Sequence, residues 1–158
     1  MPRSNESSTG EAAPFWQPST PARIVVAEED DASRELLTSR LLDDGYEVYG
    51  ASSAHELLHL LAGCTIPPVH GADLIVIDQY LPDMSGLDMI RRMRRAQSSI
   101  PFLLMTARPT QELVSESKRL RVPLLVKPFS LSDLSNAALL LLLTVTLPRD
   151  NTQPEAAI

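Results

Sequence analysis

A small set of polar side chains in this sequence combines residue types that suit phosphoryl chemistry. Each follows directly after a short apolar run: Glu28 and Glu29, Asp78, Thr106 and Lys127. Clustered carboxylates repel one another unless a divalent cation lies among them, and Mg²⁺ prefers oxygen ligands. An aspartate is a competent nucleophile toward a phosphoryl group, and Thr and Lys side chains can hold its oxygens. The set therefore indicates a divalent-cation site beside an aspartate able to accept a phosphoryl group.

Four apolar runs are the elements that would position these side chains. They cover residues 24–27, 74–77, 102–105 and 124–126, and their apolar residues are continuous rather than alternating. Continuous apolarity is typical of strands covered on both faces. The segment 46–51 is more polar, as an edge strand would be.

Helical segments are predicted between and after these strands, over 33–42, 53–61, 87–95, 110–120 and 131–147. Gly45 follows the first as a plausible residue just past a helix end, and Ser53 and Glu56 have capping-box spacing. Alternating strands and helices predict an α/β fold with a doubly wound parallel sheet. Because ligands of such sheets bind beyond the carboxyl ends of the strands, we expect the polar side chains to meet there.

Four ordered segments resemble the two-component response-regulator receiver family. They are RIVVAEEDDASRELL at 23–37, DLIVIDQYLPDMSG at 73–86, FLLMTA at 102–107 and LVKPF at 125–129. Four signatures in order make a specific signal, whereas any one alone would be weak. The resemblance implies a CheY-like, flavodoxin-like fold with five parallel strands in the order 2-1-3-4-5 over residues 23–147.

The resemblance also implies a role for each site residue. Asp78 would accept the phosphoryl group from a sensor histidine kinase, a histidine phosphotransfer protein or a small phosphodonor. Glu29, Asp78 and the backbone carbonyl of Tyr80 would bind Mg²⁺ directly, with Glu28 acting largely through water. Such a domain catalyses only its own phosphotransfer and autodephosphorylation, so it is a signalling domain and not an enzyme in the usual sense.

Thr106 and Lys127 would, by the same resemblance, hold the phosphoryl oxygens, and the Lys127–Pro128 peptide bond is expected to be cis. The composition adds an independent reason to single out Lys127, because the chain has 12 Arg and only 2 Lys. Tyr80 and Arg108 would flank the phosphoryl group and modulate its lifetime, or else simply face solvent.

Two departures from the family pattern favour an alternative function. Glu28 and Glu29 stand where the family usually has one or two aspartates, and Leu124 stands where an aromatic residue usually acts in switching. The alternative is a pseudo-receiver, a protein interaction module that retains the fold without phosphorylation-dependent switching.

Charge and cysteine content bound the remaining function classes. The 158 residues carry a net charge of −6, and an acidic balance argues against nucleic-acid binding. The one basic cluster is interpreted as a solvated helix face: Arg91, Arg92, Arg94 and Arg95. A single cysteine, no secretory signal and no apolar run near 20 residues predict a cytoplasmic protein without membrane insertion.

Other site chemistries are weakly supported. His55 and His59 are spaced as metal ligands on a helix with Cys64 and His70 nearby, but exposed helical histidines are common. A dinucleotide site needs a glycine-rich turn where residues 28–31 are acidic, and a haloacid-dehalogenase-type phosphatase needs an aspartate at the position of Tyr80.

The ends of the chain and its last helix bear on partners. Residues 1–22 and 148–158 are polar and contain prolines, so we expect flexible tails, with Phe15 and Trp16 either packing casually or docking on the domain or a partner. No DNA-binding or enzymatic segment is visible, which predicts a stand-alone receiver that signals through protein contacts to an unknown downstream partner. The leucine run from Leu139 to Leu143 would contribute to a homodimer or to partner docking, unless the N-terminal tail covers it.

Overall fold

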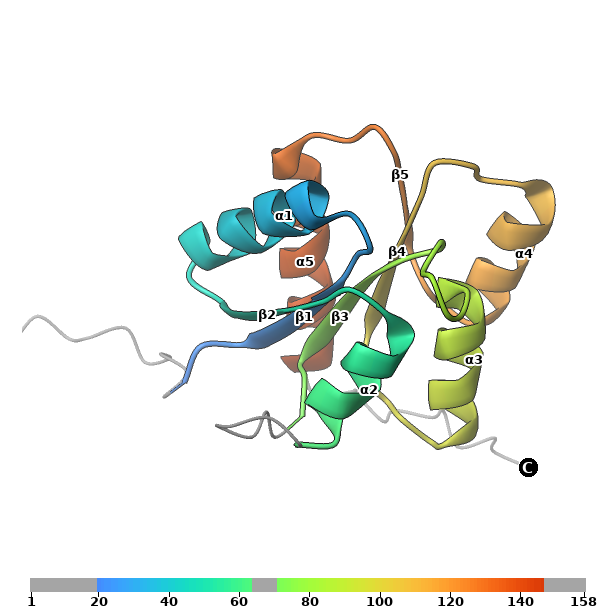
Figure 1. Ribbon diagram of the computed structural model, residues 1–158, viewed down its shortest axis with the longest axis horizontal. Helices are drawn as coiled ribbons and strands as arrows, with labels where there is room; N and C mark the ends of the chain where they lie inside the picture. Colours follow the sequence, from blue (N-terminus) through green and yellow to red (C-terminus); the bar gives the residue numbers. More distant parts are fainter. Residues whose placement is uncertain (1–19, 64–70, 147–158) are drawn as a thin grey trace, which may run out of the picture.

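The computed structural model describes residues 20–63 and 71–146, which form one parallel sheet flanked by helices (Figure 1). The strands are β1 (Arg23–Ala27), β2 (Glu47–Ala51), β3 (Leu74–Asp78), β4 (Phe102–Thr106) and β5 (Leu124–Val126). Their order in the sheet is β2-β1-β3-β4-β5, and every neighbouring pair is parallel. The expected strand order and the edge position of the second strand are therefore confirmed.

Five helices connect or follow the strands: α1 (Asp31–Asp43), α2 (Ala54–Leu61), α3 (Gly86–Arg95), α4 (Gln111–Arg119) and α5 (Leu131–Thr146). The first four begin after Asp30, Ser53, Ser85 and Thr110, whose side chains each accept a hydrogen bond from a backbone N–H three residues later. Gly45 has φ +94° just after α1, as its position predicted. The capping box at α2 differs in one detail, because the Glu56 carboxylate accepts from the Ser52 N–H instead of that of Ser53.

The sheet separates two apolar cores because successive strand residues point to opposite faces. Val25, Ile75 and Leu104 belong to the core beneath α2, α3 and α4. Their chain neighbours Val26, Val76 and Leu103 belong to the core beneath α1 and α5, in one cluster with Leu41 and Leu134. Figure 1 shows these two helical layers. Coverage on both faces explains why β1, β3 and β4 read as continuous apolar runs.

Several expectations concern residues outside the described ranges. Phe15, Trp16, Cys64 and His70 lie there, as do most of the two expected tails. No helix in the described part of the chain is long and apolar enough to cross a bilayer.

Candidate functional site

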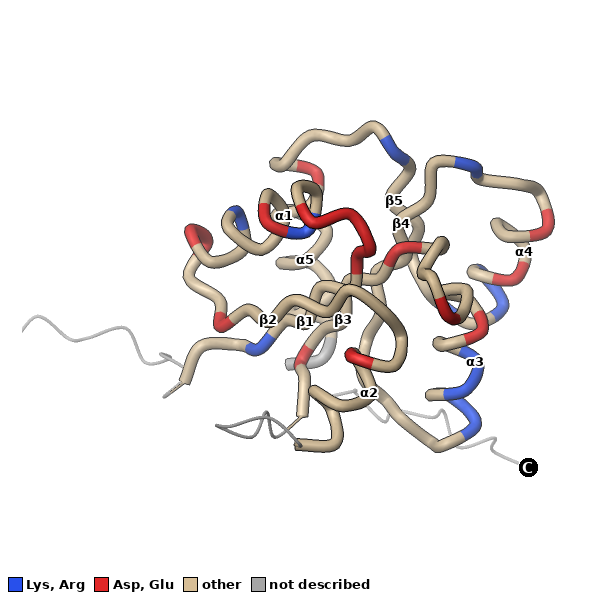
Figure 2. The backbone as a smooth tube through the Cα atoms, in the orientation of Figure 1, with Lys and Arg blue, Asp and Glu red and all other residues tan. Residues whose placement is uncertain are grey.

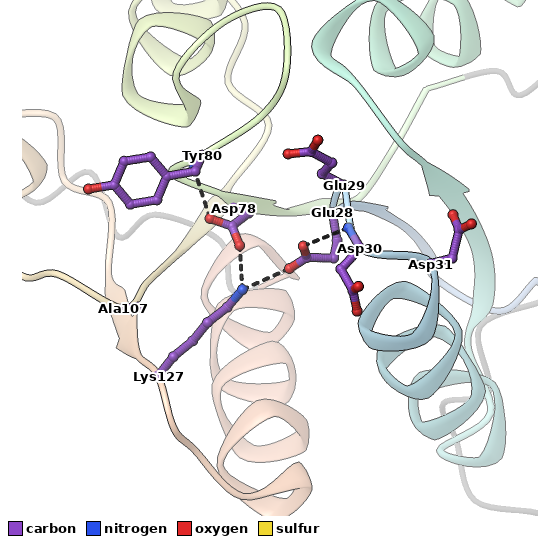
Figure 3. Close-up of a pocket in the computed structure, with 8 residues that line it drawn as sticks. All are labelled: Glu28, Glu29, Asp30, Asp31, Asp78, Tyr80, Ala107 and Lys127. Carbon is purple, nitrogen blue, oxygen red and sulfur yellow. Dashed lines mark hydrogen bonds and ion pairs between the residues drawn. The ribbon is translucent and has the colours of Figure 1, made fainter.

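Lys127 bridges two carboxylates at the carboxyl edge of the sheet (Figure 3). Its Nζ atom donates to Glu28 Oε2 at 2.8 Å and also to Asp78 Oδ2. Glu28 follows β1, Asp78 ends β3 and Lys127 follows β5, so residues 49 and 99 positions apart meet. Glu28, Asp78 and Lys127 therefore converge at this edge, as expected.

Burial makes the charges of this bridge interact strongly, because solvent screens them poorly. Glu28 and Asp78 are both buried, whereas Lys127 is half-buried. Burial raises the pKa of the Glu28 carboxyl, which the hydrogen bond from Lys127 only partly offsets. Burial lowers the pKa of Lys127, but its bonds to Asp78 and Glu28 outweigh that effect and raise the pKa overall. Lys127 is thus held as a cation between the two acids.

The loop after β3 holds Asp78 through backbone contacts. The Tyr80 N–H donates to Asp78 Oδ1 at 2.8 Å, and Gly86 N–H donates to the Gln79 carbonyl at 2.9 Å. The chain returns so closely that a Cβ atom at Gly86 would lie 2.4 Å from the Asp78 carbonyl oxygen. Glycine is needed here for this close approach, which fixes the wall of the site.

Thr106 lies beside this site but does not line it. Its side chain is fully buried at the end of β4, and its hydroxyl accepts the Arg108 N–H at 3.1 Å. Ala107 lines the pocket on that side instead. The Lys127 N–H donates to the Thr106 carbonyl at 2.8 Å, so β4 and β5 place the two predicted phosphoryl-binding residues next to each other. The Lys127–Pro128 peptide bond is cis, as the resemblance implied.

Arg34, which the sequence did not single out, holds the acidic loop between β1 and α1. Its Nη1 atom donates to the backbone carbonyls of Glu28 at 2.7 Å and Glu29 at 3.2 Å. Its Nη2 atom pairs with the Asp31 carboxylate. Two chain carbonyls and one carboxylate therefore share one guanidinium, whose planar fork suits such multiple contacts. The only sequence signal was an arginine one turn into a helix that follows the acidic run.

The oxygen donors at this edge fit Mg²⁺ in chemical type, since the carboxylate residues Glu28, Glu29 and Asp78 line the pocket together with Tyr80, whose backbone carbonyl is the remaining predicted ligand. Glu29 is exposed, and Figure 3 shows its carboxylate outside the Lys127 bridge. Within residues 20–63 and 71–146, no three His, Cys, Asp or Glu side chains already surround a common point. The Lys127 ammonium lies between the Glu28 and Asp78 carboxylates, which would otherwise repel each other. Binding of a metal ion by these carboxylates therefore requires their hydrogen bonds to Lys127 to weaken.

The pocket above the bridge has a volume of about 540 Å³ and an acidic rim. Glu29, Asp30 and Asp31 line it from the β1–α1 loop. Tyr80 also lines it, with 55% of its surface exposed, whereas Arg108 is exposed and is not among the lining residues. Of the two residues expected to flank a phosphoryl group, the structure thus brings only Tyr80 to the pocket.

Two further sequence expectations concern surfaces away from the pocket. Leu124 begins β5 half-buried against the core beneath α2, α3 and α4. In α5, Leu139, Leu140 and Leu143 are exposed, whereas Leu141 and Leu142 pack against the core beneath α1 and α5. We call the three exposed side chains the leucine strip.

The fold and this edge define a parallel α/β domain with an acid and lysine cluster built around one strand-end aspartate. The family model of the response regulator receiver domain matches residues 24–139. The chain therefore belongs to the response regulator receiver domain family.

Similar proteins agree in family and in fold. Response regulator MprA of Mycolicibacterium vanbaalenii is 34% identical over 139 residues, covering 87% of this chain and 57% of MprA. The two-component response regulator PhoP of Pseudomonas aeruginosa is 34% identical over 113 residues, covering 71% of this chain and 48% of PhoP. The chain thus spans about half the length of these relatives.

Solved receiver structures superpose over most of the chain. The non-phosphorylated HemR receiver domain of Leptospira biflexa has a TM-score of 0.68 at 27% identity and covers 81% of this chain and 97% of its own. Chemotaxis protein CheY4 of Vibrio cholerae has a TM-score of 0.67 at 25% identity, covering 77% of this chain and 99% of its own.

Proposed function

We propose that this receiver accepts a phosphoryl group on Asp78 in two-component signal transduction. The observation that carries the proposal is the buried Asp78 carboxylate, held against Lys127 at the pocket where β1, β3 and β5 end. The donor is a phosphohistidine of a sensor histidine kinase or histidine phosphotransfer protein. Because these donors are proteins, the group that enters the acidic pocket is the phosphohistidine side chain of the donor.

The transfer needs one nucleophilic oxygen and positive charge around the phosphoryl oxygens. An Asp78 carboxylate oxygen forms the new O–P bond as the N–P bond to the donor imidazole breaks, and the donor nitrogen keeps the bonding electron pair. Lys127 is already within hydrogen-bonding reach of Asp78 and changes partner from the carboxylate to a phosphoryl oxygen. Thr106 reaches the same oxygens after its hydroxyl turns from the Arg108 N–H.

Glu29, Asp78 and the Tyr80 carbonyl would hold Mg²⁺, and Glu28 would act through water. The ion, when bound, supplies positive charge near the phosphoryl oxygens. Glu28 also has a second role, because its carboxylate competes with that of Asp78 for the ammonium of Lys127. A longer carboxylate at positions 28 and 29 reaches one methylene further than aspartate, which we expect to weaken ion binding.

Phosphorylation is tested by incubating the chain with acetyl phosphate and Mg²⁺ and measuring intact mass. We expect a gain of one phosphoryl group that hydroxylamine removes, and complete loss of the gain in Asp78→Asn. Asp83→Asn is the matched control, because Asp83 lies in the loop that follows Asp78 but its carboxylate accepts the backbone N–H groups of Ala54 and His55 instead of pairing with Lys127. A gain retained in Asp78→Asn, or lost in Asp83→Asn, would contradict the assignment.

The alternative is a pseudo-receiver, favoured by the longer acids Glu28 and Glu29 after β1 and by Leu124, which begins β5 half-buried against the core beneath α2, α3 and α4. Titration with beryllofluoride and Mg²⁺, followed by amide chemical shifts, separates the two functions. Shifts confined to the neighbours of Asp78, Thr106 and Lys127 support switching. No binding at millimolar Mg²⁺ supports the phosphorylation-independent interaction module.

Output through protein contacts is proposed for the leucine strip. Leu139, Leu140 and Leu143 are 48%, 64% and 47% exposed on one helix, so their burial in a homodimer or against a downstream protein would remove apolar surface from water. Sedimentation of wild type and of Leu140→Gln tests this: we expect self-association that the variant weakens. A wild-type chain that stays monomeric at high concentration excludes the homodimer. The cytoplasmic location stays a prediction.

A further inference from the structure

A groove between α3 and α4 concentrates arginines on the helical layer opposite α1 and α5. Figure 2 shows Lys and Arg positions along α3 and at the adjoining end of α4. Two adjoining hollows, of about 570 and 330 Å³, both include Arg91, Arg95 and Arg119 among their lining residues. We call this continuous surface the arginine groove. It is separate from the acidic pocket, with which it shares no lining residue.

The arginines of α3 have three different environments. Arg94 is structural: its Nη1 donates to the carbonyls of Ser98 and Ile100, and its guanidinium lies 5.2 Å from the Phe102 ring centre. Burial lowers its pKa. Arg94 also lines the smaller hollow, but these contacts engage its guanidinium in packing.

Arg91 and Arg119 are linked across the groove because they share one carboxylate. Both donate to Glu116, at 2.7 and 2.8 Å, so α3 and α4 are joined across the groove. Arg91 also pairs with Asp88 at 2.9 Å. Two acids thus face two arginines, and this part of the groove is locally neutral.

Arg92 and Arg95 supply the excess positive charge. Both are exposed, both line the larger hollow, and neither forms an ion pair with any residue that the structure describes. Positions 88, 91, 92 and 95 share one helix face, because residues three and four apart are neighbours on a helix. Two guanidiniums that form no ion pair among the described residues therefore lie beside the ion pairs of Glu116, on a chain whose net charge is −6.

We propose that the arginine groove binds a short acidic segment of a partner protein that carries an apolar side chain between its carboxylates. Arg92 and Arg95 pair with the carboxylates, since guanidinium and carboxylate match in bidentate geometry. Met84 lines the larger hollow together with Arg92 and Arg95, which offers apolar contact for the intervening side chain. A long nucleic acid is disfavoured, because its evenly spaced phosphates would continue beyond the groove onto an acidic molecule.

The test uses the full unphosphorylated chain and a fluorescein-labelled peptide of glutamates around one central leucine. At about 150 mM salt, where screening acts beyond roughly 8 Å, we expect saturable binding by fluorescence anisotropy and amide shifts confined to α3 and α4. Arg92→Gln and Arg95→Gln should each weaken binding by about 3- to 10-fold. Arg40→Gln on α1 is the control: it removes the same charge from the opposite layer and should leave affinity within about 2-fold.

The contrary outcomes are equally specific. Absence of saturable binding overturns the proposal, and so does an equal loss in Arg40→Gln, which would show only a response to net charge. Tighter binding of a single-stranded DNA with the same number of charges would replace the acidic peptide by a nucleic acid. Because phosphorylation is not involved, these results stand apart from the test of Asp78.

Discussion

The acidic pocket and the arginine groove arrange opposite charges in two different ways. In the pocket one half-buried lysine faces two buried carboxylates, with more acids on the rim, so the local excess is negative. In the groove four exposed or half-exposed arginines face Asp88 and Glu116, so the local excess is positive. The net charge of −6 describes neither surface. Charge segregation and burial, rather than the total, determine which ligand each surface suits.

Burial also makes an ion pair in the pocket contribute more to stability than an ion pair in the groove. Lys127 and its partners are shielded from water, whereas Arg119 pairs with Glu116 at an exposed surface where water screens the charges. We therefore expect substitutions in the pocket to have larger effects than substitutions in the groove.

Lys127→Met should have the largest effect and tests the pocket directly. We expect the free energy of unfolding at neutral pH to fall by about 2–4 kcal/mol, because Glu28 and Asp78 lose the cation between them. Urea unfolding at neutral and acidic pH measures it, and the loss should shrink in acid as the Glu28 carboxyl, whose pKa burial raises, takes up a proton. Lys118→Met is the control, since Lys118 is exposed on α4 and should change stability by less than about 0.5 kcal/mol. Equal losses of stability in the two variants would contradict the expectation that the buried ion pairs of the pocket matter more than exposed charges.

Gly86→Ala tests whether the pocket wall depends on a close backbone approach. The added Cβ would lie 2.4 Å from the Asp78 carbonyl oxygen and 2.9 Å from Leu104 Cδ1. Overpacking of this kind should lower the free energy of unfolding by about 1–3 kcal/mol, measured by urea unfolding. At Gly50 the atom nearest to the added Cβ would be Cδ of the Arg34 side chain, at the longer distance of 3.2 Å, so Gly50→Ala is the milder comparison. A larger loss at Gly50 would contradict this account.

Arg34→Lys tests how the acidic rim is held in place. Lysine keeps the charge but loses the fork that serves the Glu28 and Glu29 carbonyls together. We expect stability to fall by about 1 kcal/mol and the amides of the β1–α1 loop to exchange faster with solvent in hydrogen-exchange measurements. Unchanged loop exchange would show that the guanidinium is not what orders the rim.

Glu116→Gln should have the smallest effect on stability and tests the ion pairs of the arginine groove. Hydrogen bonds from Arg119 and Arg91 lower the pKa of Glu116 to about 2. A carboxyl whose pKa is lowered by folding stabilises the folded state at every pH above the ordinary pKa of glutamate. That contribution disappears as the pH falls toward about 2. The melting temperature of the variant should be slightly lower than wild type at neutral pH and equal to it in strong acid. A difference that grows in acid would reverse the assigned sign.

Local sequence signals were enough to predict the elements of this fold. The continuous apolar runs became β1, β3, β4 and β5, and the polar segment 46–51 became the edge strand β2. Helix starts were predicted within one or two residues, because capping side chains such as Ser53 and Thr110 act on N–H groups only three residues away. Asp30 is the exception: it was read as part of the acidic run, and the structure uses it to begin α1.

The positions of the site residues were also predictable, because parallel strands place their carboxyl ends along one edge. The sequence by itself thus identified Glu28, Asp78 and Lys127 as neighbours. Their pairing depends on tertiary structure: Lys127 contacts both carboxylates, the Thr106 hydroxyl accepts the Arg108 N–H, and Arg34 holds the rim.

Only the tertiary structure distinguished the environments of residues of the same type. Arg94 is packed over Phe102 while Arg92 is exposed in the arginine groove, and Leu141 contacts the core while Leu140 is exposed. The physical reason is one of range. Backbone preference and apolar period act over a few residues and determine strands, helices and strand ends. Which cation, carbonyl or apolar surface a side chain then meets depends on segments far away in the chain, which come together only when the sheet and its two helical layers have assembled.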